Sequence, residues 1–182
     1  MLYLFITAEF SENIEKLYVA DTETDPAEYP FKLKCTKCGE LAEKVIHFNL
    51  FEKHENSGSK GENSFTMKCK FCESENSILA NSFEPCLFAQ QEEHSDNDKR
   101  KKYGLNGNKI DINNYAAIMQ LDSRGWDIEE LFFADMPFKV ELKTGTMMDC
   151  QFDEDGTWYD YDDESGEEVN IVDFRYKIEK GK

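Results

Sequence analysis

The chain has 182 residues, of which 40% are hydrophobic and 13% aromatic, and it carries a formal net charge of −17. This hydrophobic content is enough to form a buried core and excludes a chain that is disordered throughout. The excess of acidic residues disfavours binding to nucleic acid and to anionic membranes, because both ligands are themselves negatively charged.

The negative charge is concentrated in the second part of the chain. Residues 1–114 contain 20 acidic and 14 basic side chains, whereas residues 115–182 contain 18 acidic and 7 basic ones. Between Asp149 and Glu168 there are ten acidic residues and no basic one. A solvated face or hairpin explains such a run, and docking of a basic partner is the alternative.

The cysteines and the first residues both bear on the cellular compartment. Residues 1–9 lack the basic start of a secretory signal and end in the acidic Glu9. No apolar run reaches the length of about 18 residues that a membrane-spanning helix needs. We therefore expect a soluble protein of a reducing compartment, the cytoplasm and as a further location the nucleus. There, paired CxxC motifs hold metal or carry redox chemistry rather than form disulfides.

Short alternating apolar stretches predict strands in the first part of the chain. The first stretch, residues 2–7, is apolar on both of its alternating faces. Aromatic and β-branched residues are frequent in all of these stretches, which also favours strands over helices. The predicted strands cover residues 2–7, 31–35, 45–50, 65–69 and 78–83, with turn-rich segments at 21–30 and 56–63.

The polar segment 90–109 separates two regions rich in strand patterns, and we expect it to be a linker or an inserted loop. Its basic residues 99–102 belong to a solvated loop or form a nuclear import signal. Beyond it, strands are predicted at residues 110–121, 126–133, 138–142, 158–161 and 169–178. The only helical alternative is short and lies near 128–133, and a shift of the apolar pattern within 169–178 indicates a β-bulge.

Two short sequence echoes suggest an internal duplication. Residues 67–73, Met-Lys-Cys-Lys-Phe-Cys-Glu, resemble residues 148–154, Met-Asp-Cys-Gln-Phe-Asp-Glu, and residues 33–39 have a fainter counterpart at 121–125. Both echoes stand in the same order, 80 to 90 residues apart. We infer a duplicated β unit whose second copy has lost its ligands, with Ser123 and residues 150–153 as the counterparts of the cysteine pairs. Chance similarity is the alternative.

Two CxxC motifs predict a metal site formed by Cys35, Cys38, Cys69 and Cys72. Each motif places two sulfurs on one tight turn, close enough to bind the same zinc ion at about 2.3 Å. The thirty residues between the motifs contain a strand, a loop and a strand, so a hairpin brings the second pair back to the first. A glycine follows the first pair, where a zinc-binding turn often needs a positive φ, but a glutamate follows the second.

We expect one zinc ion per chain, in a structural role. Four thiolates fill a tetrahedral shell and leave no position for a reactive water, so the site does not support hydrolysis. The metal should instead cross-link the chain and contribute folding free energy. Flanking lysines are expected to favour the thiolate forms, namely Lys34, Lys37, Lys68 and Lys70.

The remaining candidate side chains are predicted to be structural. Cys86 and Cys150 are expected to be core or edge thiols, with a second metal site or a redox pair as the alternative. His47 is predicted in a strand, and His54 and His94 in polar loops, rather than as ligands. No nucleotide-binding glycine loop, serine-nucleophile motif or EF-hand spacing occurs, so we predict no catalytic residues and no enzyme activity.

Four motifs carry a resemblance to a known family. They are Leu-Lys-Cys-Thr-Lys-Cys-Gly-Glu at residues 33–40, Lys-Cys-Lys-Phe-Cys-Glu-Ser-Glu-Asn-Ser at 68–77, Thr-Gly-Thr at 144–146 and Trp-Tyr-Asp-Tyr-Asp-Asp at 158–163. With these motifs the chain resembles the eukaryotic CXXC-motif zinc-binding proteins, a family of obscure function. The resemblance covers nearly the whole chain, although the segment 90–108 looks longer than in typical members. It implies an all-β protein of two similar halves, with zinc in the first half only, held by the four CxxC cysteines.

Together these observations predict an all-β fold of two similar β-sheet units, packed as a sandwich-like or barrel-like structure. Residues 1–89 are the zinc-binding unit, 90–109 the linker or inserted loop, and 110–182 the acidic unit without metal. Apolar packing should hold the acidic unit together, and the candidates are Trp126, Phe132, Phe138, Phe152, Trp158 and Phe174.

Two functional hypotheses from different classes follow from this organisation. The leading one is a monomeric, non-enzymatic interaction or adaptor module that binds a protein partner but neither nucleic acid nor membrane. The alternative is a thiol-redox or metal-handling protein that uses the two CxxC pairs.

Overall fold

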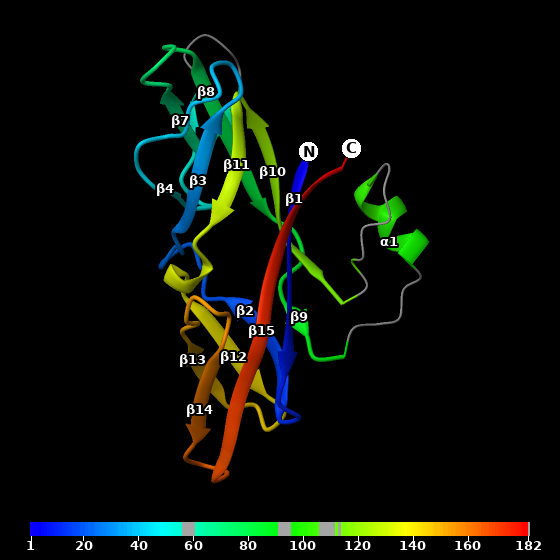
Figure 1. Cartoon of the computed structure of the whole chain (residues 1–182). Coiled ribbons are helices and arrows are strands. Elements are labelled where there is room, and N and C mark those ends of the chain that lie inside the picture. The colour runs from blue at the N-terminus through cyan, green and yellow to red at the C-terminus, as the bar shows by residue number, and fades with distance from the viewer. Residues whose placement is uncertain (56–60, 91–95, 106–111, 113, 182) are drawn as a thin grey trace.

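Figure 1 shows a computed structural model of the chain, which describes residues 1–55, 61–90, 96–105, 112 and 114–181. The regular secondary structure of the described part consists almost entirely of strands, as predicted, with one helix, α1 (Asp96–Tyr103), and one 3-10 turn, Phe133–Asp135. The strands are β1 (Leu2–Phe10), β2 (Ile14–Val19), β3 (Tyr29–Cys35), β4 (Ile46–Phe48), β5 (His54–Glu55), β6 (Glu62–Asn63), β7 (Phe65–Lys68), β8 (Glu75–Ser82), β9 (Leu87–Phe88), β10 (Ala116–Arg124), β11 (Trp126–Leu131), β12 (Phe138–Leu142), β13 (Met147–Cys150), β14 (Trp158–Asp162) and β15 (Glu167–Lys180).

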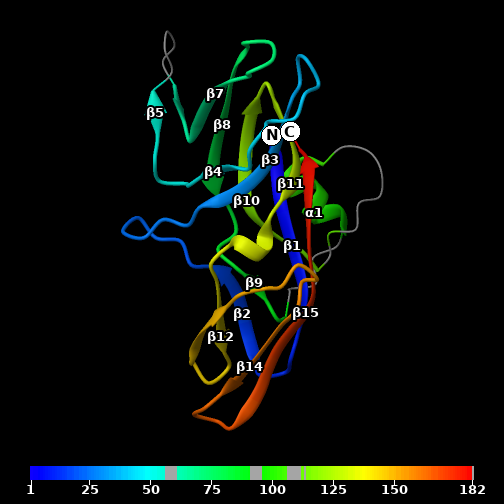
Figure 2. The ribbon, with the colours of Figure 1, turned by 60° about the vertical axis from the view of Figure 1, so that its left-hand side comes forward.

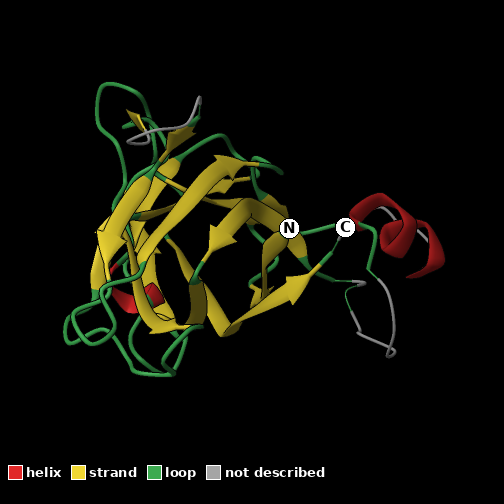
Figure 3. Cartoon of the chain, turned by 90° about the horizontal axis from the view of Figure 1, so that it is seen from above, coloured by secondary structure: helices red, strands yellow, loops and turns green. Residues whose placement is uncertain are grey.

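Three sheets and one short ribbon organise these strands. The largest sheet has six strands in the order β14-β15-β1-β10-β8-β7. A three-stranded sheet, β11-β3-β4, and a four-stranded sheet, β13-β12-β2-β9, complete the two ends of the molecule, and β5 pairs with β6 alone. Seen from above, the sheets curve around a common interior as an open barrel, with α1 outside it (Figure 3).

Each large sheet contains strands from both sides of the segment 90–109. In the six-stranded sheet β1 pairs with β10 and β15, while β3 pairs with β11 and β2 pairs with β12 in the smaller sheets. The division in space therefore differs from the predicted sequence division into 1–89 and 110–182. β10 and β11, which follow the segment 90–109 in the chain, pair with β8 and β3, which precede it. Conversely, β1 and β2 from the first part pair with β15 and β12 from the second.

Two units follow from this pairing, and they repeat the same arrangement. The cysteine unit comprises β3, β4, β7 and β8 with β10 and β11, at the top of Figure 1; the acidic unit comprises β12 to β15 with β1 and β2, at the bottom. The same backbone contact also recurs in both: Thr36 N donates to Gly125 O at 3.1 Å, and Lys143 N donates to Asn13 O at 2.9 Å. The two units are joined where β1 and β10 pair in antiparallel orientation.

The sequence echoes pointed to the wrong counterparts within this repeat. Ser123 lies on β10 and pairs with Ile78 of β8, so it belongs to the cysteine unit itself. Cys150 ends β13 and pairs with Phe138. The turns that correspond to the two cysteine turns instead follow β12 and β14, as shown by strand pairing rather than by sequence similarity.

β1 lies at the centre of the fold because both of its faces are apolar, as predicted. Leu4 and Ile6 are fully buried in the main core, which extends through both units. Tyr3 and Phe5 point to a smaller cluster on the opposite face, where Phe5 lies 5.1 Å from the ring of Tyr103. A strand covered on both sides in this way holds the two units in one continuous body.

The segment 90–109 is more than a polar linker in its described part. The helix α1 covers one face of β1, and its last residue, Tyr103, is buried. Glu84 anchors it, because its Oε1 accepts hydrogen bonds from the Tyr103 hydroxyl at 2.6 Å and from Lys102 Nζ at 2.8 Å. The polar composition of segment 90–109 gave no sign of this contact, because a single aromatic side chain is enough to attach a polar helix to the core. Residues 91–95 and 106–109 lie outside the described residues.

Most of the other predicted elements are confirmed, with small shifts of their ends. The segment near 128–133 is a strand up to Leu131, and only residues 133–135 form a helical turn. The predicted bulge lies within β15, where the register against β1 shifts between Arg175 and Val172, and Asp173 takes a φ of 54°. In the acidic unit Phe138, Phe152 and Phe174 form an aromatic cluster, with the Phe152 and Phe174 rings 4.5 Å apart.

Candidate metal centre

The four CxxC cysteines lie together at the end of the cysteine unit. Cys35 is the last residue of β3 and Cys38 follows in the turn, while Cys69 comes directly after β7 and Cys72 lies in the turn before β8. Figure 2 shows these two turns side by side at the same end of the molecule. The hairpin predicted from the spacing therefore does return the second pair to the first.

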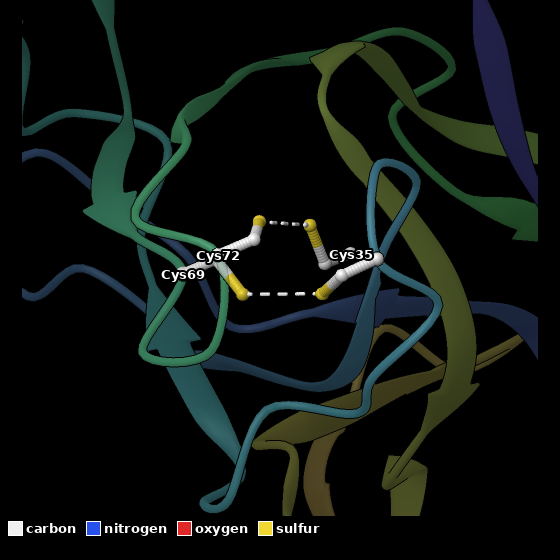
Figure 4. A group of neighbouring side chains, drawn as sticks. Cys35, Cys69 and Cys72 are labelled. Atoms are coloured by element: carbon white, nitrogen blue, oxygen red, sulfur yellow. Dashed lines mark hydrogen bonds between the residues drawn. The ribbon is translucent and has the colours of Figure 1, made fainter.

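The sulfur spacings fit a tetrahedral metal ion. All four Sγ atoms lie within 4.8 Å of one another. The Cys35 and Cys72 sulfurs are 3.7 Å apart, and the Cys38 and Cys69 sulfurs are 3.6 Å apart (Figure 4). Zinc–sulfur bonds of about 2.3 Å in a tetrahedron require sulfurs about 3.8 Å apart. An all-sulfur tetrahedral set of this size is typical of zinc or of iron–sulfur sites.

The two turns share one backbone geometry. In the first, Gly39 N donates to Cys35 O at 2.8 Å and Cys35 N donates to Glu40 O at 2.9 Å. In the second, Glu73 N donates to Cys69 O and Cys69 N donates to Ser74 O, both at 2.9 Å. The turn requires a positive φ after its second cysteine, and Glu73 adopts 59° where Gly39 adopts 77°. A non-glycine residue is strained there, which indicates that the surrounding contacts enforce the turn.

Neighbouring polar side chains support the sulfurs, and sequence reasoning did not identify them. The Ser74 hydroxyl lies 3.1 Å from Cys72 Sγ and 3.5 Å from Cys35 Sγ. The buried Asn76 amide donates to Cys35 Sγ at 3.6 Å. A Cβ at Gly125 would lie 2.1 Å from Asn76 Oδ1, so this glycine leaves the room that Asn76 occupies. The hydroxyl and amide that closely follow Cys72 in the sequence are the signal that could have revealed them.

Hydrogen bonds set the thiol pKa values. The Cys38 N–H and then the Ser74 hydroxyl lower the pKa of Cys35 to about 5. The Ser74 hydroxyl and N–H lower the pKa of Cys72. The Glu40 N–H also lowers the pKa of Cys38, but loss of solvent and the thiols of Cys69, Cys35 and Cys72 outweigh it and raise this pKa to about 12. Without metal, the group therefore favours the thiolate at Cys35 and retains a proton at Cys38, and the Cys72 thiol ionises more readily than an ordinary thiol.

The lysines around the cysteines act differently from the prediction. Lys34 lies 3.9 Å from Glu129, Lys68 lies 3.4 Å from Glu75, and Lys70 pairs with Glu43. Their charges are thus directed to carboxylates, and backbone and side-chain hydrogen bonds stabilise the thiolates instead. Lys37 forms no ion pair with any described residue.

Access to the sulfurs is uneven across the group. Cys35 and Cys69 are buried, with 0% and 3% of their surface exposed, whereas Cys38 is exposed and Cys72 is partly exposed. A metal ion here would lie near the surface with its inner side packed against the core. The buried Trp126, which pairs with Cys35, forms part of that packing.

The other candidate ligands lie apart from this centre. Cys86 and Cys150 are buried thiols, and burial raises the pKa of both, that of Cys150 to about 12. This confirms them as packing residues. His47 and His54 are exposed, and His94 lies outside the described residues. Within the described ranges, the four CxxC cysteines are the only group of three or more His, Cys, Asp or Glu side chains close enough to share a metal.

No helix in the described part of the chain is both long enough and apolar enough to cross a membrane.

The fold and the site together define an all-β protein with a four-cysteine site of zinc-binding type. A family model described as "CXXC motif containing zinc binding protein, eukaryotic" matches residues 3–179, and the chain belongs to this family. The expected family resemblance is therefore confirmed.

Relatives and solved structures agree with this assignment. The Saccharomyces cerevisiae UPF0587 protein YCR090C is 39% identical over 100% of this chain and 99% of its own length. The human CXXC motif containing zinc binding protein is 26% identical over 82% of this chain and 81% of its own length. The crystal structure of C1orf123 superposes with a TM-score of 0.72 at 25% identity and covers 98% of both chains. The fold is thus shared across nearly the whole chain.

Proposed function

We propose that the metal is zinc, and that each chain binds one ion through Cys35, Cys38, Cys69 and Cys72 in a structural role. The support is the all-sulfur donor set, whose spacings match a zinc tetrathiolate. When bound, the ion supplies a cross-link between the turn after β3 and the turn after β7. Four thiolates fill its shell, so no position remains on the metal for water or substrate.

On this scaffold the protein acts as a non-enzymatic interaction or adaptor module. The filled cysteine shell carries this proposal, because it gives the metal a structural use and no catalytic one. The ten acidic residues between Asp149 and Glu168 add a surface that suits a basic protein partner. The same charge disfavours nucleic acid and anionic membranes as partners.

The protein is expected to work as a monomer in a reducing compartment, the cytoplasm and as a further location the nucleus. All six cysteines are free thiols, which suits a compartment that keeps thiols reduced. Fluorescence imaging of the tagged chain together with light scattering of the purified protein tests both statements.

Affinity capture with the zinc-loaded chain tests the interaction function. A reproducible protein partner, captured by the wild-type chain and lost with Cys69→Ser, is the expected result. Cys150→Ser, which changes a buried thiol outside the metal centre, is the matched control and should retain the partner. Turnover in an unbiased substrate screen, with no reproducible partner in the capture, would overturn the proposal.

Exposure of the metal centre favours thiol-redox or metal-handling chemistry as the second candidate. Cys38 is exposed, and its sulfur lies 3.6 Å from that of Cys69. In the redox version, two thiolates give two electrons to one peroxide, a disulfide forms, the peroxide is reduced to water, and zinc is released.

Peroxide treatment of the zinc-loaded protein separates this candidate from the first one. Stoichiometric zinc release together with loss of free thiols at low peroxide would support it. Retention of zinc with all four thiols unmodified rules out the redox version, and failure to exchange zinc with a chelator rules out metal transfer.

A further inference from the structure

The strand β14 offers an unpaired backbone edge. It is the terminal strand of the six-stranded sheet, and β15 is the only described strand that pairs with it. The Tyr161 N–H points away from β15, since it donates to Asp160 Oδ1 at 2.7 Å. Because N–H directions alternate along a strand, the Tyr159 N–H also points outward. Such an edge is a template for the addition of another strand.

Exposed aromatic rings accompany this edge. Tyr159 is 70% exposed and Tyr161 is 50% exposed, although both belong to a regular strand. Most large aromatic side chains of the described chain are packed, so two neighbouring exposed rings need a reason. Tyrosine faces attract the ammonium and guanidinium groups of Lys and Arg and contact their aliphatic stems.

The charge along the strand is of one sign. Residues 158–168 contain six acidic side chains and no basic one, and Asp160 and Asp163 are both exposed. Acidic side chains on an edge oppose pairing between two copies of the same chain, because like charges would face each other. The same charges favour a strand of opposite sign.

A buried carboxylate at the end of β14 lacks part of its hydrogen bonding. Asp162 is 3% exposed, and its Oδ1 accepts a hydrogen bond from Glu164 N at 3.1 Å. Its Oδ2 is buried and accepts no hydrogen bond from any described residue. A buried carboxylate oxygen without a donor is unfavourable, and its charge adds to the negative potential that a cationic segment beside the strand would meet.

From these four observations we infer that β14 is a docking strand for an extended, Lys- or Arg-rich segment of a partner protein. The segment adds to the six-stranded sheet as a further strand beside β14. Backbone hydrogen bonds to the outward N–H of Tyr159 and to the outward carbonyl groups of Tyr159 and Tyr161 hold the segment, and its basic side chains contact the tyrosine rings and the carboxylates. This inference rests on the proposed interaction function and names the chemical class of the partner.

A synthetic peptide tests the inference on the whole zinc-loaded chain. The probe is a peptide of about eight residues, a usual strand length, in which Lys alternates with Thr and Val. Fluorescence anisotropy should show binding that weakens between about 50 and 300 mM salt, because the contact is electrostatic. The matched peptide with Glu in place of Lys should not bind. Amide exchange should show new protection at Tyr159 with the Lys peptide, because its outward N–H gains a backbone partner.

Variants separate strand addition from simple charge attraction. Tyr159→Pro removes an outward N–H at a position where an edge strand tolerates proline, and Tyr159→Ser removes the same ring but keeps that N–H. Strand addition predicts at least about fivefold weaker binding for Tyr159→Pro than for Tyr159→Ser. Circular dichroism with a zinc assay verifies that both variants are folded. Equal affinity of the two folded variants, or no binding of the Lys peptide to the wild type, would overturn the inference.

A pair of charge variants locates the contact on the surface. Asp160→Lys should weaken binding of the Lys peptide by at least about tenfold. Glu15→Lys makes the same change of charge on β2, which is paired on both sides, and should change the affinity by less than about threefold. A captured natural partner that tolerates Asp160→Lys contradicts β14 as its docking strand while leaving the interaction function intact.

Discussion

The cysteine unit and the acidic unit share one strand arrangement but differ in what stabilises it. In the cysteine unit, four sulfurs converge between the turn after β3 and the turn between β7 and β8. In the acidic unit the corresponding turns contain no cysteine, and the aromatic rings of Phe138, Phe152 and Phe174 pack together at the opposite end of β12 and β14. The same backbone framework can therefore be completed by metal ligation or by apolar packing.

The turns of the acidic unit that correspond to the two cysteine turns differ from them in length and in side chains. The turn after β12 is one residue shorter than its counterpart: Gly145 N donates to Leu142 O, three residues back, whereas Gly39 N donates to Cys35 O, four residues back. In the turn after β14, Gly166 N donates to Asp162 O at 2.8 Å, four residues back, as Glu73 N does to Cys69 O. Asp162 thus occupies the place of Cys69 and, like it, is 3% exposed.

The largest expected effect is the loss of metal from the cysteine unit. Cys35→Ser or Cys69→Ser should reduce zinc from one ion per chain to none, because three thiolates form an incomplete shell. The cysteine unit should unfold when the zinc is lost, since zinc binding and folding are coupled. Metal analysis by mass spectrometry and thermal melting measure both effects. Cys150→Ser is the control and should keep one zinc; two zinc ions per chain, or metal loss in this control, would show that the ligands are misassigned.

The reciprocal change in the acidic unit should lower stability without changing the zinc content. Phe174 is 3% exposed and contacts Phe138 and Phe152, so Phe174→Ala should reduce the free energy of unfolding by about 3–5 kcal/mol. Denaturant titration monitored by fluorescence measures the loss, and metal analysis should still find one zinc per chain. Zinc release by this variant under native conditions would contradict the separate stabilisation of the two units.

Two glycines with similar backbone conformations, one beside the sulfurs and one in the acidic unit, provide a sharper test of the support around the sulfurs. Gly125 and Gly145 have φ angles of 85° and 89°, but a Cβ at Gly125 would lie 2.1 Å from Asn76 Oδ1 while one at Gly145 meets nothing within 4 Å. Both alanine variants should lose about 1 kcal/mol from backbone strain. Only Gly125→Ala should also weaken zinc binding, by about tenfold, because it displaces Asn76 from Cys35. Equal zinc affinities from competition with a chelator would refute this role of Asn76.

A further expected effect is the pH dependence of zinc affinity. Zinc displaces the thiol protons, and the pKa of Cys38 is raised to about 12 whereas that of Cys35 is lowered to about 5. Between these values binding releases the Cys38 proton, so affinity should rise with pH, by about tenfold per unit for each proton released. Below about pH 5 the slope should steepen, because Cys35 is then protonated as well. Competition titrations across this range test the trend, and a flat profile would contradict it.

Sequence patterns located most of the long strands and the metal-ligand candidates, but they missed β2 and β13 and could not reveal which distant strands pair. Alternation in β1 and the two CxxC spacings are local signals, and both led to the correct local structure. Pairing of β3 with β11 depends on contacts between residues far apart in the chain, which periodicity does not encode. For the same reason the sequence echo assigned Ser123 to the wrong unit.

The contacts around the cysteine sulfurs could not be predicted from local sequence patterns either. The flanking lysines suggested that positive charge favours the thiolates, but three of them pair with glutamates. Ser74 and Asn76 take the supporting role because the turn after β7 and the start of β8 place them beside the cysteine sulfurs, a geometry visible only after folding. Glu73 shows that a positive φ can be imposed without glycine when both turn hydrogen bonds are formed.

Hydrogen exchange before and after zinc removal tests the central claim most directly, namely that metal stabilises one unit and aromatic packing the other. With a chelator present, backbone amides of residues 35–42 and 69–74 should lose protection, because the metal no longer holds the two cysteine turns. Amides of β14 and β15 beside the Phe174 cluster should exchange at nearly the same rate as before. A uniform loss of protection through both units, or unchanged protection around the cysteines, would contradict it.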